Sequence, residues 1–293
     1  MEKNTVQIQN VTLGAGIPKV CVPVMGKDLR EWTEAATAAR EQADLIELRL
    51  DSVSPELDAD RVRQACRVVR EKAQGSALLA TMRTSRDGGA GDGDTERYET
   101  LLVTLARERL CDALDVELSV GEAAFARIAQ EAHAAGVPVV GSYHDFGGTP
   151  ENAEMLARLH AMARLGADVC KIAVMPRDIR DVSRLKAVCM QANDELPQPI
   201  IAISMGELGA STRTDAEAMG SCLSFGTAGA GSAPGGMGAR APRKAPVEGD
   251  PKKSGPGTPL RPPQIGGLRR INKKKQRKIK RRNETEEKKE DGK

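Results

Sequence analysis

The sequence is poor in aromatic residues and in long apolar runs. Aromatics make up 2% of its 293 residues, so recognition of bases or sugars by stacking has little to work with. No stretch reaches the roughly 18 consecutive apolar residues of a transmembrane helix. The first ten residues, MEKNTVQIQN, lack the apolar core of a secretory signal. We therefore expect neither a membrane span nor secretion.

Cysteine pairs and zinc-ligand spacings are also lacking. The six cysteines are scattered along the chain: Cys21, Cys66, Cys111, Cys170, Cys189 and Cys222. No two form a C-x-x-C pair, so we expect reduced core residues and a cytoplasmic location. His133, His144 and His160 show no ligand spacing to the cysteines, and no zinc site is expected.

Charge is distributed unevenly along the chain. The net charge of +3 combines a body, residues 1–236, with 25 basic and 34 acidic residues, and a segment, residues 237–293, with 19 basic and 7 acidic residues. Residues 236–268 hold 7 glycines and 7 prolines, and residues 269–282 hold 10 basic residues. Neither stretch can bury a core, so we expect a folded domain over 1–236 and a disordered tail over 237–293.

Short runs rich in Val, Ile and Leu alternate with longer amphipathic segments. The runs predict eight strands, at residues 19–24, 45–50, 77–83, 113–117, 137–143, 169–174, 200–205 and 221–226. Strand–helix alternation implies parallel strands with right-handed crossovers. Eight of them predict an α/β fold of the (β/α)8 TIM-barrel type. A doubly wound open sheet is the alternative, but no glycine-rich phosphate loop follows the first run.

The ends of this barrel are less regular. Residues 6–8 and 11–13 alternate in polarity and predict a hairpin across the barrel floor. Because the sequence changes character after Gly235, we expect the eighth helix to be missing. Helix starts are predicted at Asp28, with Leu29 on the buried face, at Thr149 with Pro150 in the first turn, and at Asp178.

Charged residues interrupt the apolar runs at two-residue spacing. Glu47, Arg49 and Asp51 would share one face of a strand, and Asp115 and Glu117 repeat the pattern. Charges that face the barrel interior must be paired. A structural ion-pair network is one interpretation, and an active site at the carboxyl ends of the strands is the other.

Lys171 lies within the apolar run 169–174. Burial among apolar residues disfavours a charged amine, and a neutral amine at a barrel mouth is what Schiff-base chemistry on a ketone requires. His144 on the neighbouring strand would transfer protons, although a satisfied core histidine is the alternative. Arg83 and Arg213 would hold an anionic substrate by bidentate contacts.

Six segments, in order within residues 4–235, resemble type I 3-dehydroquinate dehydratase. They are ELRLD at 47–51, TMRT at 81–84, GSYHDFGGTP at 141–150, GADVCKIAVMP at 166–176, Met205-Gly206 followed by Arg213, and GSAPG at 231–235. The blocks at 141–150 and 166–176 are highly specific in combination.

The resemblance implies a lyase of the shikimate pathway, which leads to chorismate and the aromatic amino acids. It implies a (β/α)8 barrel, a homodimer, and dehydration of 3-dehydroquinate to 3-dehydroshikimate with no metal or other cofactor. Lys171 would be the Schiff-base lysine and His144 the general acid and base. Substrate contacts would come from five further residues: Glu47, Arg49, Arg83, Arg213 and Ser232.

Three positions depart from the family pattern. Asp87 stands where a glutamate is usual, so its hydrogen bond to His144 would be weaker, and Thr212 replaces a serine. Gly236 takes the place of a glutamine in the loop that closes over substrate, and activity would suffer. The abrupt change there is compatible with a frameshift, a read-through or a fusion.

Two other functions remain open. One is an inactive barrel whose basic tail binds nucleic acid or an acidic partner in a salt-dependent way. A solvated tail with no binding role is the favoured interpretation, since no aromatic residue follows Phe225. The other is a different Schiff-base barrel enzyme, such as an aldolase.

Overall fold

The computed structural model describes residues 3–54, 56 and 58–227. Eight parallel strands form one sheet in the order β10-β3-β4-β5-β6-β7-β8-β9. They are β3 (Lys19–Val24), β4 (Leu45–Arg49), β5 (Ala77–Thr81), β6 (Ala113–Glu117), β7 (Val139–Asp145), β8 (Val169–Val174), β9 (Ile200–Ser204) and β10 (Leu223–Phe225). A single bridge between Ile200 and Ser221 links the two edges, so the sheet is a nearly closed barrel and the predicted (β/α)8 fold is confirmed.

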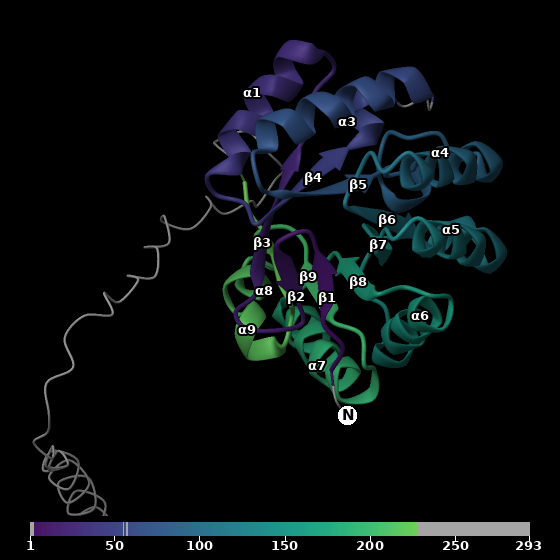
Figure 1. Ribbon diagram of the computed structural model, residues 1–293. Coiled ribbons are helices and arrows are strands. Elements are labelled where there is room, and N and C mark those ends of the chain that lie inside the picture. The colour runs from purple at the N-terminus through teal and green to yellow at the C-terminus, as the bar shows by residue number, and fades with distance from the viewer. Residues whose placement is uncertain (1–2, 55, 57, 228–293) are drawn as a thin grey trace, which may run out of the picture. The chain divides into compact units, whose positions relative to one another are not determined.

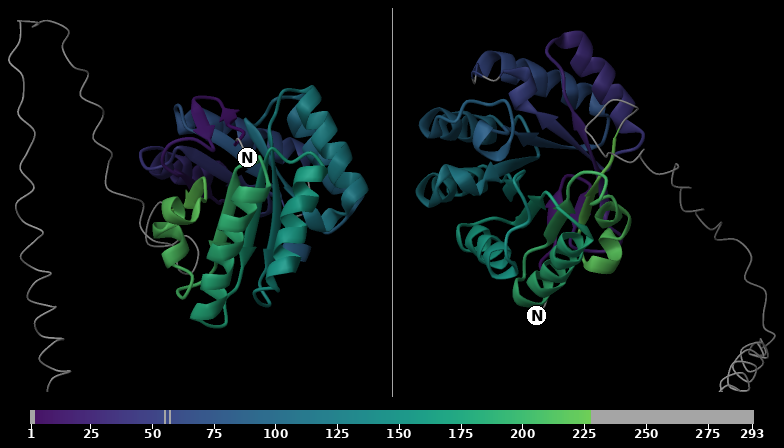
Figure 2. Two further views of the ribbon diagram at one scale, coloured as in Figure 1. Left: turned by 90° about the horizontal axis from the view of Figure 1, so that it is seen from below. Right: turned by 180° about the vertical axis from the view of Figure 1, so that it is seen from behind.

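Helices surround the strands, as Figure 1 shows in a view along the barrel and Figure 2 from two other sides. The long ones are α1 (Leu29–Arg40), α3 (Ala59–Ala73), α4 (Thr95–Arg107), α5 (Glu122–Ala134), α6 (Asn152–Arg164) and α7 (Ile179–Glu195). The short ones are α2 (Leu50–Val53), α8 (Ser211–Thr214) and α9 (Ala216–Met219), with 3-10 turns at Ser85–Asp87 and Leu118–Val120. None of these helices is long and apolar enough to cross a membrane.

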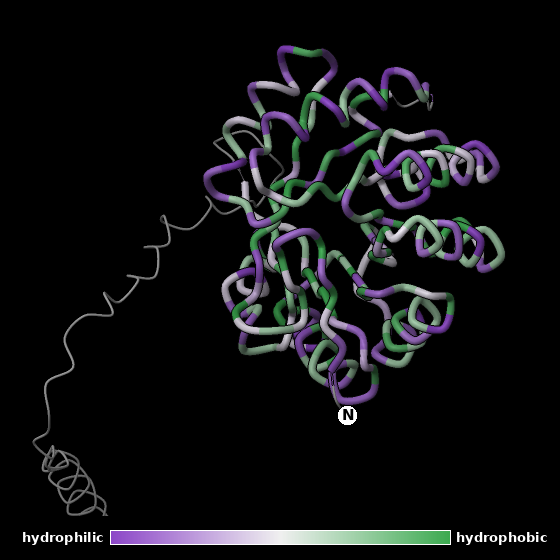
Figure 3. The backbone as a smooth tube through the Cα atoms, viewed as in Figure 1, coloured by the Kyte–Doolittle hydropathy of each residue, from purple (hydrophilic) through white to green (hydrophobic). Residues whose placement is uncertain are grey.

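The alternation of side chains along the strands creates two apolar clusters. Ile46, Leu48 and their equivalents pack outward against the helices, whereas Leu45, Val169 and Ile201 pack inside the barrel. Figure 3 shows apolar residues along the strands and polar ones on the outer turns. Because the side-chain period is two, Glu47 and Lys171 must face the interior with Leu45 and Val169.

The predicted hairpin is present as β1 (Val6–Ile8) and β2 (Val11–Leu13). Its four apolar side chains join the inner cluster, together with the first residues of β4, β5, β6 and β8. The hairpin therefore closes the amino-terminal end of the barrel, and the interior opens toward the carboxyl ends of the strands.

A polar side chain before every second strand accepts a hydrogen bond from the backbone of the strand that precedes it. The residue before β4, β6 or β8 is an aspartate whose Oδ2 accepts the backbone N–H of the preceding strand: Asp44 from Val20 at 2.8 Å, Asp112 from Leu78 at 2.8 Å, and Asp168 from Val139 at 2.7 Å. Ser221, before β10, accepts in the same way from Ala202 at 3.3 Å. These side chains satisfy buried strand donors near the barrel floor.

Two predicted helix starts are confirmed and one is wrong. Asp28 accepts the N–H of Glu31, and Asp178 accepts that of Arg180. Thr149 caps nothing, because its hydroxyl donates to the carbonyl of Met175 and α6 begins only at Asn152.

Two further expectations about side-chain placement are wrong. Leu29 is 54% exposed although it opens α1; the buried face starts at Trp32. Asp51 is not on a strand, because β4 ends at Arg49 and the chain turns into α2, where Asp51 pairs with that arginine.

Other expectations fall on residues that the structure does not describe. They are the tail over 237–293, the missing eighth helix, and the positions of Ser232 and Gly236. The six cysteines are all free; five are buried, and Cys222 is half-buried.

Candidate active site

The interior of the barrel has a polar wall and an apolar wall. Strands β4 to β8 direct charged and hydroxyl side chains inward, namely Glu47, Thr81, Asp115, Glu117, Ser142 and Lys171, all of them buried. On the other side, β9, the residue that follows it and β10 place apolar side chains in or against the inner cluster, namely Ile201, Ile203, Met205 and Phe225. A ring-shaped molecule with polar groups on one side would find complementary surfaces here.

Lys171 lies at the boundary between these walls. Its side chain is 4% exposed, and Nζ lies 3.4 Å from Oε1 of Glu47 and 3.3 Å from Oδ2 of Asp115. The ring of Phe225 faces the same nitrogen, with its centroid 4.6 Å away. The expectation that apolar residues alone surround this amine is wrong, because Cys170 and Ile172 face the outer cluster on the other side of the sheet.

A buried ion-pair network includes Asp115, one of the two carboxylates beside the amine. Arg83 binds Oδ1 of Asp115 through Nη2 and Oε1 of Glu117 through Nη1, each at 2.8 Å. Burial alone would raise the pKa of the Asp115 carboxyl, but the cations of Arg83 and Lys171 hold it below its usual value. Asp115 is therefore ionised, and the predicted pairing of inward charges is confirmed.

His144 lies on the neighbouring strand, two residues beyond the one opposite Lys171. In the β7–β8 ladder Ser142 is opposite Lys171 and His144 is opposite Ala173. Burial, reinforced by the cations of Arg83, Lys171 and Arg49, lowers the pKa of the imidazole well below 6.5. The ring is thus neutral at pH 7 and can accept a proton.

Asp87 orients the histidine. Its Oδ2 accepts the backbone N–H of His144 at 3.0 Å and lies 3.3 Å from Nδ1 of the ring. The carboxyl is buried, and burial raises its pKa. The ring contact is long for a charge-assisted hydrogen bond, which is typically about 2.7–2.9 Å.

The two other arginines predicted for the site, Arg49 and Arg213, differ in how many of their N–H groups already have a hydrogen-bond partner. Arg49 forms a two-point ion pair with Asp51 through Nε and Nη2, at 2.9 and 2.8 Å. Arg213 lies in α8, which is tied to β10 because the hydroxyl of Ser224 donates to the Arg213 carbonyl. Its Nη1 is buried and has no hydrogen-bond partner among the described residues. That nitrogen is therefore ready for an acceptor that comes with a ligand.

Six of the eight predicted site residues thus belong to the carboxyl-terminal half of the barrel interior or its rim: Glu47, Arg49, Arg83, Asp87, His144 and Lys171. Arg213 lies beside β10, and Ser232 lies outside the described residues. Sequence reasoning did not place Asp115 beside the lysine, although its spacing marked it as inward-facing. It also missed Phe225, which nothing but its place on the last strand could have indicated.

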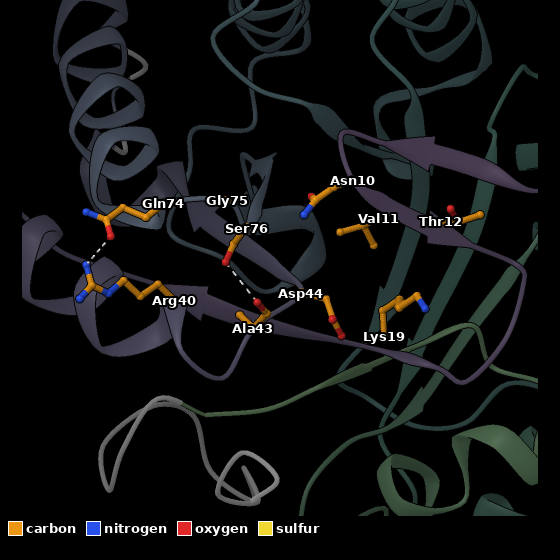
Figure 4. A pocket seen from close by; sticks show the side chains of 10 residues that line it. All are labelled: Asn10, Val11, Thr12, Lys19, Arg40, Ala43, Asp44, Gln74, Gly75 and Ser76. Atoms are coloured by element: carbon orange, nitrogen blue, oxygen red, sulfur yellow. Dashed lines mark hydrogen bonds between the residues drawn. The ribbon is translucent and has the colours of Figure 1, made fainter. Parts of the chain in front are cut away.

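A surface pocket lies at the amino-terminal end of the barrel (Figure 4). Its lining includes Lys19, Arg40, Asp44 and Ser76, at or just before the starts of strands and at the end of α1. It contains none of the candidate site residues and is separate from the candidate site. Within the described part of the chain, no group of three or more His, Cys, Asp or Glu residues could hold a metal ion.

The chain is similar to proteins of one family. A model described as type I 3-dehydroquinase matches residues 20–245. The 3-dehydroquinate dehydratase of Lactiplantibacillus plantarum is 40% identical over 232 residues, which are 78% of this chain and 92% of that protein. The Klebsiella pneumoniae protein of the same name is 38% identical over 234 residues, or 79% and 93%.

Solved structures of the same family are similar to this chain in fold and in sequence. The type I 3-dehydroquinate dehydratase from Clostridium difficile, solved with covalent modified comenic acid, has a TM-score of 0.77 at 35% identity, covering 80% of this chain and 94% of that one. The 3-dehydroquinate dehydratase from Geobacillus kaustophilus has a TM-score of 0.76 at 33% identity, covering 81% and 93%.

Proposed function

The chain belongs to the type I 3-dehydroquinase family, and from this premise we propose that it dehydrates 3-dehydroquinate through an imine on Lys171. The activity is that of a lyase of the shikimate pathway, which converts 3-dehydroquinate to 3-dehydroshikimate. We assign each step of this reaction to individual side chains of the barrel interior.

In the first step Lys171 attacks the ring ketone. An ammonium must lose a proton before it can do so, and the two acceptors within 3.4 Å are Glu47 and Asp115. Asp115 is also paired with Arg83 at 2.8 Å, and the cations of Arg83 and Lys171 lower its pKa, which disfavours its protonation. We therefore assign the proton to Glu47, whose Oε1 also accepts the hydroxyl of Thr81 at 3.0 Å.

In the second step His144 moves a proton between carbon and oxygen. The cationic imine acidifies the adjacent C–H, and the neutral imidazole accepts that proton. The resulting imidazolium then donates it to the departing hydroxyl, which leaves as water. Asp87 contacts this histidine at its backbone N–H, at 3.0 Å, and at Nδ1 of its ring, at 3.3 Å. Hydrolysis of the imine releases product and Lys171.

The substrate carboxylate and hydroxyls need fixed partners. Arg213 is assigned to the carboxylate, because its buried Nη1 has an unused donor among the described residues. Arg83 donates to two protein carboxylates already, so we assign it, with Arg49 and Glu47, to hydroxyl contacts. Ser232 stays a predicted contact.

The observation that carries this proposal is a buried lysine inside the barrel, with a histidine that burial keeps neutral on the neighbouring strand, two residues beyond the one opposite the lysine. Borohydride added with 3-dehydroquinate should reduce the imine and leave a stable adduct on Lys171, detected by peptide mass spectrometry. Lys171→Met should abolish both the adduct and the conjugated enone product seen by ultraviolet absorbance. Lys186→Met, which removes a surface ion pair with Asp215, is the matched control and should remain active. A folded, unmodified parent chain would contradict the proposal.

We also propose a homodimer that works in the cytoplasm. The free cysteines agree with a reducing compartment, and the dimer rests on the family resemblance. Light scattering of the full chain would measure its mass, and a monomeric mass would contradict the dimer. Nucleic-acid binding through the basic segment is not part of the proposal.

A further inference from the structure

Phe225 occupies an unusual place for an aromatic residue in this chain. Three other aromatic side chains, Trp32, Tyr98 and Phe125, are fully buried in the outer cluster between strands and helices. Phe225 instead packs against the inner cluster, with its ring centroid 4.6 Å from Nζ of Lys171. An aromatic face at that distance attracts a cation through the ring quadrupole.

The position of this ring is fixed by its strand. Phe225 pairs with Cys21 of β3 in parallel register, and the next N–H, from Gly226, donates to the Cys21 carbonyl at 2.9 Å. On the preceding residue, the Ser224 hydroxyl ties β10 to α8. The backbone that carries the ring is therefore held in place without the lysine.

The two carboxylates and the ring act on the nitrogen in different ways. Glu47 and Asp115 accept hydrogen bonds from the ammonium, which has three N–H donors. Formation of the imine changes this, since R–NH3⁺ + O=C gives R–NH⁺=C + H2O. The positive charge stays on the nitrogen, but only one N–H remains. Attraction to an aromatic face needs no N–H, so the ring keeps its effect when hydrogen bonds are lost.

We propose that Phe225 stabilises the cationic imine on Lys171 through its π face. This inference rests on the proposed Schiff-base function and adds a residue to it. The ring also lies against the nitrogen and so limits access of water to the imine. The contribution is electrostatic, and it should follow the electron density of the ring rather than its size.

Fluorinated phenylalanines test this at nearly constant shape. Mono-, di- and trifluorinated residues placed at position 225 withdraw electron density in steps. We expect kcat to fall with each step, to a total of roughly five- to tenfold for the trifluorinated ring. The share of Lys171 trapped by borohydride at steady state should fall in parallel. Binding of a carboxylate analogue without the ketone should not change.

Controls separate this inference from the function on which it rests. The same fluorinated residues at Phe125, buried on α5 outside the barrel interior, should leave kcat unchanged. Phe225→Leu should lower kcat, and Phe225→Tyr should retain more activity, with both variants folded by circular dichroism. An active parent whose kcat ignores fluorination at 225 would overturn this inference alone. A parent with no product and no adduct on Lys171 would overturn both.

Discussion

The carboxylate of Asp87 contacts His144 at two points, its backbone N–H at 3.0 Å and its ring Nδ1 at 3.3 Å. The first bond is well formed and the second is long, so the carboxylate is better placed to hold the strand than the imidazole. A side chain one methylene longer could approach the ring more closely without losing the backbone contact.

We therefore expect opposite effects from two changes at this position. Asp87→Asn removes the charge that favours the productive tautomer of the His144 ring, and it should lower kcat by about tenfold or more. Asp87→Glu should equal or exceed the parent. Enone formation at saturating substrate measures both, and Asp92→Asn, which changes a partly exposed acid of the same loop, should have no effect. Full activity in Asp87→Asn would argue that the ring needs no carboxylate.

The pKa of His144 offers a second test that requires no turnover. Burial lowers it most, and the cations of Arg83, Lys171 and Arg49 lower it further. Arg49→Ala removes one of these cations and admits water, and both changes favour the imidazolium. The pKa should therefore rise toward about 6.5, the value of a free histidine. The chain has three histidines, so NMR titration can follow each one.

The control for this titration is Arg40→Ala, which removes a cation at the end of α1, in the lining of the surface pocket shown in Figure 4. The His144 titration should be the same in that variant as in the parent, and so should those of His133 and His160 in both variants. A pKa for His144 that stays constant or falls in Arg49→Ala would mean that the arginine does not act on the ring through its charge.

The fold was more accessible to sequence reasoning than the site was. Strand positions follow from local composition, and the inward orientation of Glu47 and Asp115 follows from two-residue spacing. Their meeting at Lys171 does not, because these residues are separated from it by 124 and 56 positions and come together only when the barrel closes. For the same reason, the apolar residues next to Lys171 in the sequence predicted an amine with only apolar neighbours. In the structure two carboxylates lie beside it.

A helix start predicted from local sequence was also wrong where the side chain binds a residue distant in the sequence. Thr149 followed by Pro150 is a typical helix start, yet the hydroxyl donates to Met175, 26 residues away. The strand pattern, by contrast, correctly predicted that Lys171 and His144 lie on adjacent strands.

Removal of the shared carboxylate should cost stability. Asp115→Asn leaves two buried cations, Arg83 and Lys171, with one fewer counterion. Breaking a buried ion pair typically destabilises by about 3–5 kcal/mol. Urea unfolding followed by circular dichroism should show this loss. Asp60→Asn breaks a pair whose acid is 94% exposed and should change stability by less than about 1 kcal/mol. Equal stabilities would mean that the network rearranges around the amide.

The repeated aspartates at the barrel floor make a prediction that separates stability from activity. Asp112 accepts the N–H of Leu78 at 2.8 Å and pairs with Arg70 at 2.9 Å. Asp112→Ala leaves that N–H without its acceptor and should cost about 1–3 kcal/mol in urea unfolding. Asp112→Asn keeps an acceptor oxygen and loses only a half-exposed ion pair, so it should cost less. Both variants should keep the parent's kcat, because the site lies at the other end of the strands. A drop in kcat at full stability would instead link the two ends of the barrel.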